Sequence, residues 1–175
     1  VHPGVCHIVS YVSYKHDLDI AERLRDVLFY REQVGKDLAR AFLSCPSLPP
    51  FVALYGDLGV GKTAFVRGFT SVFSPLSRVK SPTFSLVHEY KGESLTVFHF
   101  DMYRIESEDE LDSIGFYDYW NRSGICLVEW SEKIPYAIPD EYVKVLIEKD
   151  DEVLFKAGEV KASEEASLAD KSLLD

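Results

Sequence analysis

The sequence predicts an α/β domain in which helices and an antiparallel hairpin flank a mixed, mainly parallel central sheet. A short apolar run at residues 51–55 is followed by a glycine-rich turn and then by a helix-like segment from about residue 62 to residue 73. This order of strand, turn and helix is typical of parallel α/β folds. The chain has 175 residues, which is the size of one such domain.

Composition and charge limit the classes of function. The chain is 46% hydrophobic and 27% charged, which is ordinary for a folded globular protein. Its formal net charge is -10, and half of that excess lies in residues 150–175, with eight acids against three lysines. Because nucleic acid is bound chiefly through lysine and arginine, we expect this chain to reach a polynucleotide only through a second protein.

The three cysteines and the hydropathy predict a cytoplasmic protein. The odd cysteine count, without a CxxC spacing, argues against a disulfide framework and against a zinc site, and a reducing compartment is the simplest setting. No apolar stretch approaches the roughly 18 residues that span a bilayer, so we expect no membrane association.

The elements follow from periodicity and from turn signals. Residues 17–44 carry apolar side chains at helical spacing, with Asp17 as a possible cap and Gly35 as a point where the helix divides in two. Three prolines in residues 45–50 stop this helix before the strand at 51–55.

The second half of the chain is rich in β signals. We expect a hairpin from residues 83–90 and 95–101, a buried strand at 125–128, and a terminal hairpin from 142–147 and 153–155. Between them, Ser107 and Glu110 fit a capping box that opens a short helix, and Gly115 closes it.

These elements define one domain at residues 17–156. We assign no role to the extension at residues 1–16, and we expect residues 157–175 to be an acidic tail, frayed or helical.

Eight consecutive residues match G-x-x-x-x-G-K-[ST], which is the pattern of a phosphate-binding P-loop. The glycines let backbone N–H groups turn toward phosphates, while the helix that follows presents its positive end. Lys62 then meets the β- and γ-phosphates, and Thr63 offers a hydroxyl to Mg²⁺. The motif predicts a P-loop NTPase fold and an ATP site made of Gly56, Asp57, Leu58, Gly59, Val60, Gly61, Lys62 and Thr63. We expect no nucleotide contact from position 64, which follows the motif.

A P-loop also needs a carboxylate for the metal at the end of a neighbouring strand. Asp101 ends the run at 95–101 and fits this role, although an aspartate there also caps a turn in many proteins. His99 alternates with apolar neighbours, and we interpret it as a packed core histidine.

Two further segments are candidates for the site. Thr83, after Ser81 and Pro82, either contacts Mg²⁺ or the γ-phosphate or belongs to a simple turn. Glu129 and Trp130 follow the strand at 125–128, at the edge where open α/β sheets bind ligands. Glu129 there positions or polarises water and Trp130 packs near the base, or else the pair is a surface glutamate beside a buried tryptophan.

Arg104 and Arg122 are candidates to stabilise phosphate charge. A surface ion pair with the acids of residues 106–112 is the simpler interpretation of each arginine. We interpret the acids themselves as a solvated helix start that complements the helix dipole.

Four stretches together resemble the TsaE family, also called YjeE: residues 54–63, 79–84, 99–104 and 127–130. They occur in the family's order and spacing over residues 33–148. The resemblance implies an ATPase that binds ATP and Mg²⁺ at the P-loop, with Thr63 and Asp101 at the metal. It also implies that Lys62, Thr83 and Glu129 are catalytic and that Trp130 lies close to the nucleotide.

The resemblance further implies a role in modifying adenosine 37 of tRNA to threonylcarbamoyladenosine. The family hydrolyses ATP to sustain turnover of the TsaD and TsaB proteins, weakly alone and faster with them, and meets tRNA only through that complex. The chain departs from the family at Arg31, where members often have a small hydroxyl residue four places before the glycine that is Gly35 here.

Two other functions remain open at this point. A small-molecule or nucleoside kinase needs an acceptor base and a lid with arginines, and only Arg104 and Arg122 are available. A non-catalytic module that changes partners on ATP occupancy needs only the P-loop. A GTPase is disfavoured because the sequence has no N-K-x-D segment to read guanine.

Overall fold

The computed structural model describes residues 20–148 and 153–159. Within these residues one six-stranded sheet has the strand order β2-β3-β4-β1-β5-β6. The strands are β1 (Phe51–Tyr55), β2 (Val87–Lys91), β3 (Thr96–Asp101), β4 (Gly124–Glu129), β5 (Glu141–Ile147) and β6 (Val153–Glu159). The helices are α1 (Ile20–Ser44), α2 (Lys62–Phe73) and α3 (Glu108–Ser113), with short 3-10 turns η1 (Phe116–Asn121), η2 (Ser131–Lys133) and η3 (Pro135–Ala137).

The pairing of the strands confirms the predicted fold class. Strands β3, β4, β1 and β5 pair in parallel, whereas β2 and β6 join the two edges in antiparallel pairs. The inner strands β1 and β4 are buried on both faces, as parallel strands between layers of helix usually are. The carboxyl ends of the four parallel strands therefore meet at one edge of the sheet.

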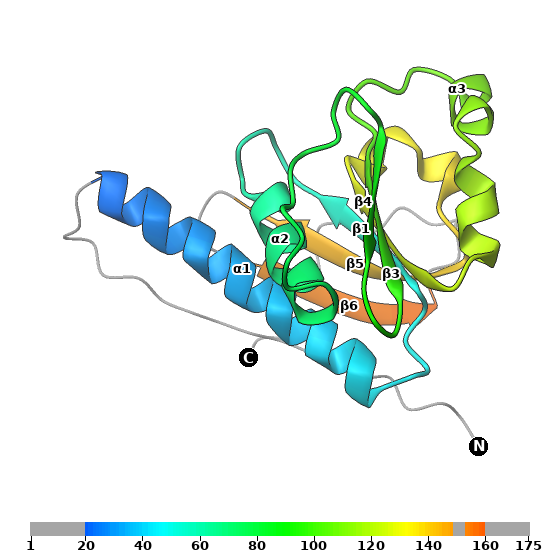
Figure 1. Ribbon diagram of the computed structural model, residues 1–175. Coiled ribbons are helices and arrows are strands. Elements are labelled where there is room, and N and C mark those ends of the chain that lie inside the picture. Colours follow the sequence, from blue (N-terminus) through cyan, green and yellow to red (C-terminus); the bar gives the residue numbers. More distant parts are fainter. Residues whose placement is uncertain (1–19, 149–152, 160–175) are drawn as a thin grey trace.

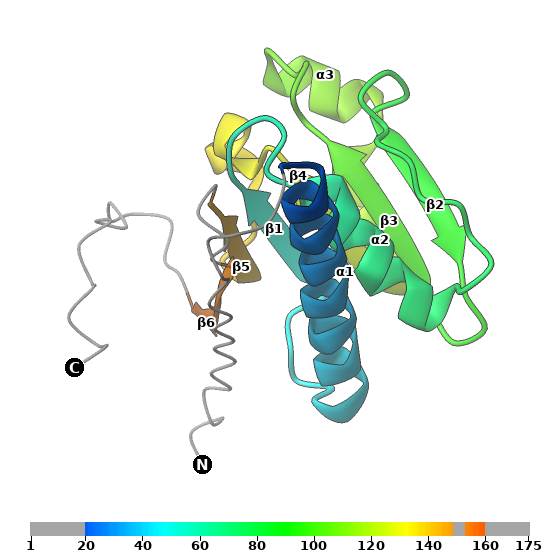
Figure 2. The ribbon, with the colours of Figure 1, turned by 90° about the vertical axis from the view of Figure 1, so that its left-hand side faces the viewer.

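Helices lie on both faces of the sheet. Figure 1 shows α1 and α2 on one face and α3 with η1 on the other, and Figure 2 shows α1 lying along α2. Alternate residues of β1 divide between the two cores, since Val52 and Leu54 pack with Phe65 and Phe69 of α2, whereas Ala53 packs on the opposite side with Phe116. This alternation follows from the two-residue period of a strand.

Gly35 does not divide the first helix, so that expectation was wrong. Helix α1 runs without interruption to Ser44. A Cβ atom on Gly35 would lie only 2.2 Å from the carbonyl oxygen of Phe65 and 2.8 Å from the amide nitrogen of Phe69. Glycine is therefore present because two helix backbones approach closely, not because the helix ends. The expected cap, Asp17, lies outside the described residues.

The predicted β hairpin is correct in its pairing and wrong at its start. Strand β2 begins at Val87, not at residue 83. Before it, the chain turns so that the Leu86 amide donates to the Pro82 carbonyl oxygen at 2.6 Å, and Leu86 adopts a left-handed φ of 66°. This turn leaves Thr83 free to face the end of β3 instead of entering the ladder.

The helix begins where the capping box predicts it, but neither hydrogen bond of the box forms. Helix α3 begins after Ser107, but the Ser107 side chain makes no capping hydrogen bond, and the Glu110 carboxylate accepts from the Glu106 amide at 3.0 Å. Gly115 follows the helix at a left-handed φ of 66°, in agreement with its predicted role as a stop.

The last described strand extends further than the sequence predicted. Strand β6 continues to Glu159, so residues 157–159, expected in the tail, pair with β5. Residues 1–16 and 160–175 lie outside the described residues. Among the helices that are described, none combines the length and the apolar character that crossing a bilayer requires.

Arg31 joins three separate parts of the fold. Its side chain is fully buried, and its Nε donates to the Val60 carbonyl oxygen at 3.3 Å in the loop between β1 and α2. One terminal nitrogen donates to the Glu148 carbonyl oxygen at 2.8 Å, just beyond β5. Its aliphatic part also fills the space beside Gly61, where an added Cβ would lie 3.0 Å from Arg31 Cγ. Arg31 therefore supports the loop from behind.

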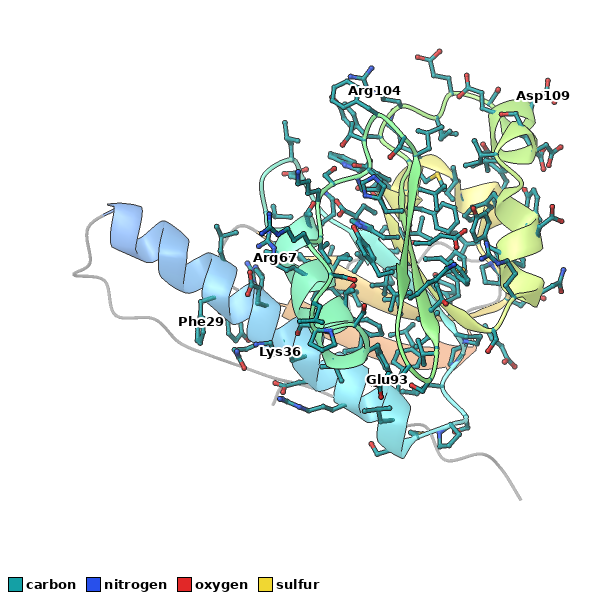
Figure 3. The ribbon with its side chains drawn as sticks, in the orientation of Figure 1. Phe29, Lys36, Arg67, Glu93, Arg104 and Asp109 are labelled. Carbon is teal, nitrogen blue, oxygen red and sulfur yellow. The ribbon has the colours of Figure 1, made fainter. Side chains whose placement is uncertain are left out.

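Because α1 and α2 approach closely at Gly35, we expect alanine to destabilise this helix, although alanine normally stabilises one. Within a helix, replacing glycine by alanine normally stabilises by about 1 kcal/mol. We expect Gly35→Ala instead to lower the free energy of unfolding by about 1–3 kcal/mol, because the new methyl group meets backbone atoms that cannot move aside. Urea unfolding measures this, with Lys36→Ala at a position that points away from the sheet (Figure 3) as the control. A more stable Gly35→Ala variant would contradict the packing.

The buried arginine gives a second prediction. We expect Arg31→Met to lower the free energy of unfolding by about 1–3 kcal/mol, because the carbonyl oxygens of Val60 and Glu148 lose their donor. Arg40→Met, on the same helix but exposed and paired with the exposed Asp37, should stay within about 0.5 kcal/mol of the wild type. Chemical denaturation of both variants checks this, and equal stability of the two would show that Arg31 does not support the loop.

Candidate nucleotide-binding site

The loop between β1 and α2 has the geometry of a phosphate cradle. Gly56, Gly59 and Gly61 have φ values of 140°, 81° and 99°, a range in which other residues are strained. Gly61 directly precedes Lys62, the first residue of α2. The loop therefore wraps the N-terminal end of a twelve-residue helix, where free amides and the helix dipole favour an anion.

The other residues of the loop differ in exposure. Asp57 and Leu58 are exposed with Gly59, whereas Val60 is buried against the core. Val60 anchors the loop through its side chain, while its carbonyl oxygen holds Arg31. Asp57 contributes its backbone carbonyl to Lys62, so the loop acts mainly through backbone atoms.

Position 64 adds no binding group after the motif. The residue at this position is Ala64. Its methyl group is buried at 4% exposure on α2 and carries neither a donor nor an acceptor. Thr63 is therefore the one side-chain hydroxyl that the first turn of α2, which the structure describes in full, can offer to a metal.

Lys62 turns its ammonium group inward. It is 5% exposed, and its Nζ donates to the carbonyl oxygens of Gly56 and, at 2.9 Å, Asp57. The same nitrogen lies 3.7 Å from the centre of the Trp130 ring, a cation–π contact. Burial lowers the pKa of Lys62, and the negative charge of Glu129 is the largest opposing influence.

Thr63 and Glu129 meet across the site. The Thr63 hydroxyl donates to Glu129 Oε1 at 2.9 Å, which joins the start of α2 to the end of β4. The same carboxylate oxygen lies 2.8 Å from His99 Nε2 of β3. Glu129 is 3% exposed, so it is not the surface glutamate that the sequence left as an alternative.

Asp101 is the centre of a second group of hydrogen bonds. Its Oδ2 accepts from Ser81 Oγ at 2.9 Å and from Thr83 Oγ1 at 2.7 Å. Its Oδ1 accepts from the Tyr103 amide at 3.0 Å, which is a turn-capping bond. Asp101 therefore caps a turn and also holds the segment of Thr83. The turn-capping interpretation of Asp101 is confirmed, and its role as a metal ligand stays a prediction.

Trp130 is held over the site by an unusual backbone conformation. Its φ of 60° is left-handed, which is costly for a large side chain, and strain of this kind gathers at functional sites. The ring lies 4.9 Å from the Tyr103 ring, centre to centre, and faces the Lys62 ammonium. The tryptophan is half-buried at the rim, not part of the core.

The strand register explains why these residues gather. In the parallel pair of β3 and β4, Asp101 and Glu129 are direct neighbours, and Glu129 also lies opposite Leu54 of β1. In Figure 3, Glu93 lies at the end of the sheet where β3 begins, and Arg104 lies at the opposite end, just beyond the last residue of β3. The P-loop, Asp101 and Glu129 lie at the same end of the sheet as Arg104.

The two candidate arginines, Arg104 and Arg122, do not form the expected ion pairs with the acids of residues 106–112. Arg122 binds both carboxylate oxygens of Glu89, at 2.7 and 2.8 Å, and not the acids of residues 106–112. Arg104 lies over the Phe84 ring at 4.6 Å and forms no ion pair with the described acids. The prediction of pairs with the α3 acids was therefore wrong: Arg122 pairs with Glu89 of β2, and Arg104 stacks on the Phe84 ring.

Sequence reasoning missed two residues near the site. His99 is a buried histidine as expected, but it bonds to Glu129 and does not merely fill space. Its place two residues before Asp101, on the same face of β3, was the signal available in the sequence. Arg31 appeared only as a departure from a family pattern, and nothing in its neighbours predicted its bond to Val60.

Comparison with known proteins identifies the family. The family described as "Threonylcarbamoyl adenosine biosynthesis protein TsaE" matches residues 29–157. Proteins named tRNA threonylcarbamoyladenosine biosynthesis protein TsaE are 43% identical over 101 residues in Haemophilus influenzae and 40% identical over 103 residues in Bacillus subtilis. Each match covers 58% of this chain and 64% of the relative, so the chain spans less than two thirds of these two proteins.

A relative of the same name from Rickettsia felis is 35% identical over 147 residues, which cover 82% of this chain and 84% of the relative. The crystal structure of YdiB from Bacillus subtilis superposes with a TM-score of 0.55 at 24% identity and 89% coverage of both chains, which supports the fold alone. The four motifs, the P-loop fold and the extent of these matches lead to one conclusion: the chain belongs to the TsaE family.

Proposed function

We propose that this chain hydrolyses ATP to ADP and phosphate as the accessory protein of tRNA threonylcarbamoyladenosine modification. Family membership supports the pathway, since the relatives carry that name. One observation carries the chemistry: a left-handed glycine loop and a buried lysine stand beside two carboxylates, Asp101 and Glu129, at neighbouring strand ends. Phosphoryl transfer needs this combination of phosphate binding and charge placement.

The loop and Lys62 would hold the phosphates. The amides of residues 56–61 and the start of α2 favour the anion through direct bonds and the helix dipole. Lys62 Nζ now donates to two neutral carbonyl oxygens. Phosphate oxygens are stronger acceptors because they are charged. The ammonium would therefore exchange the carbonyls for phosphate when ATP binds.

The residues present fit a magnesium ion that is shared with the nucleotide. The Thr63 hydroxyl donates a hydrogen bond to Glu129, which leaves the lone pairs of the Thr63 oxygen available, and Asp101 is a buried carboxylate opposite Glu129 in the sheet. Magnesium is usually held by one or two protein oxygens together with phosphates and water. Bound there, it would neutralise charge on the β- and γ-phosphate oxygens. We assign Thr63 and Asp101 as its protein ligands.

Glu129, Thr83 and Trp130 would complete the site. Glu129 is a buried acceptor at the end of β4, and in this place it can orient water for in-line attack. Thr83 is bonded to Asp101, so its segment would respond to whatever binds that carboxylate. Trp130 stacks on Lys62 and would pack against the nucleotide.

The partners follow from the family and agree with the charge of the chain. We propose the TsaD and TsaB proteins as partners in the cytoplasm, with tRNA adenosine 37 as the modified nucleoside. A net charge of -10 makes direct binding to tRNA unfavourable, so tRNA would be held by the partners. We expect hydrolysis to be weak alone and faster in their complex.

Phosphate release tests this proposal. We expect Lys62→Ala to lose nearly all turnover, at least about 100-fold, because the phosphates lose their buried counter-charge. Lys91→Ala removes an exposed lysine of β2 far from the loop and should hydrolyse ATP at the wild-type rate. Normal turnover of Lys62→Ala would show that the site is assigned wrongly.

The same assay with and without TsaD and TsaB separates the remaining alternatives. Stimulated release supports the accessory ATPase. Transfer of phosphate to a small acceptor would instead support a kinase, and tight ATP binding without release would support a non-catalytic binding module.

A further inference from the structure

A buried hydrogen bond joins the two inner strands behind the candidate site. His99 on β3 and Glu129 on β4 lie 2.8 Å apart, Nε2 to Oε1, with side-chain exposures of 0% and 4%. Because a carboxylate only accepts, the imidazole donates from Nε2. The other ring nitrogen, Nδ1, is buried without a hydrogen-bond partner in the described part of the chain. The only hydrogen bond of the ring within that part is therefore directed at Glu129.

The same carboxylate oxygen also receives the Thr63 hydroxyl, at 2.9 Å. One oxygen atom thus accepts from the buried strand on one side and from the start of α2 on the other. A glutamate has three rotatable side-chain bonds, and fixing them costs conformational entropy. Two donors on one oxygen select a single orientation of Glu129, and His99 supplies the donor that belongs to the rigid sheet.

We propose that His99 is a positioning residue, which fixes the Glu129 carboxylate and through it the direction of the Thr63 hydroxyl. This inference rests on the proposed function, because it assigns the orientation of two residues of that site. With His99 in place, the Thr63 hydroxyl donates its hydrogen bond to Glu129, which leaves the lone pairs of the Thr63 oxygen available for the magnesium ion. Without it, Glu129 gains alternative rotamers and Thr63 loses its fixed acceptor.

The alternative is that His99 only packs in the core, where its ring lies 6.2 Å from the Tyr90 ring. Three substitutions separate the two roles. His99→Phe keeps an aromatic ring and removes the donor, whereas His99→Gln keeps an N–H donor at a similar reach. Val97→Ala removes apolar volume two residues earlier on the same face of β3, away from Glu129, and controls for lost stability.

The full chain of each variant is tested for ATP hydrolysis and for binding of a non-hydrolysable ATP analogue by calorimetry over a range of Mg²⁺ concentrations. We expect His99→Phe to lower kcat by about 10- to 100-fold, as loss of an orienting partner typically does. KM for ATP should change little, and the Mg²⁺ concentration for half-maximal analogue binding should rise. His99→Gln should recover most of the lost kcat and most of the lost Mg²⁺ affinity. Val97→Ala should lower the melting temperature without changing the Mg²⁺ dependence.

Wild-type kcat and Mg²⁺ dependence in His99→Phe would overturn the inference, as would an equal change in Val97→Ala. A wild-type chain that neither binds nor hydrolyses ATP would instead overturn the proposed function.

A second measurement does not depend on how His99→Phe folds. In the wild type, the imidazole Nε2 proton of His99 should exchange slowly with solvent in nitrogen-15 NMR spectra. Glu129→Gln, which keeps the size of the side chain and weakens the acceptor, should shift that signal. A rapidly exchanging proton in the wild type would contradict the hydrogen bond itself.

Discussion

The buried ammonium of Lys62 is the charge around which the other groups of the site are arranged. Burial lowers the pKa of Lys62, so the charged form requires nearby acceptors and anions. The carbonyl oxygens of Gly56 and Asp57 are the acceptors, and Glu129 is the anion that most strongly favours the charged form. The left-handed glycines make this possible, because they let the loop turn its carbonyls and amides around a single side chain. A phosphate that enters the cradle meets a cation already in place.

The register of the sheet is the second requirement. Asp101 and Glu129 lie at one end of the sheet because β3 and β4 pair in parallel with these two residues opposite each other. A slip of one residue in β3 would turn Asp101 and His99 to the face covered by α3 and η1. The apolar residues on both faces of β3 and β4 prevent such a slip, since it would expose or displace them. The core therefore fixes which side chains reach the loop.

Much of this arrangement could be predicted from local sequence. The P-loop, the strand before it and α2 follow from a contiguous pattern whose physical meaning is local, and strands β3 to β5 follow from short apolar runs. The rest depends on contacts between distant residues. Gly35 resembled a helix break because its reason for being glycine is the backbone of α2, 30 residues away. His99 resembled a core histidine because its partner lies on another strand, and Arg122 found Glu89, not the acids closer in sequence. Patterns along one segment carry no information about such partners.

The central claim is that phosphate oxygens take the Lys62 ammonium away from the loop carbonyls and from Trp130. The chain has two tryptophans, and Trp120→Phe is a conservative change in an aromatic cluster remote from the loop, so Trp130 becomes the single indole reporter. Its fluorescence is then followed during titration with ATP and Mg²⁺, and again in a chain that also carries Lys62→Ala. The account predicts a saturable change in Trp130 emission that disappears in the Lys62→Ala background. Emission that stays constant up to millimolar ATP, with an unchanged melting temperature, would contradict it.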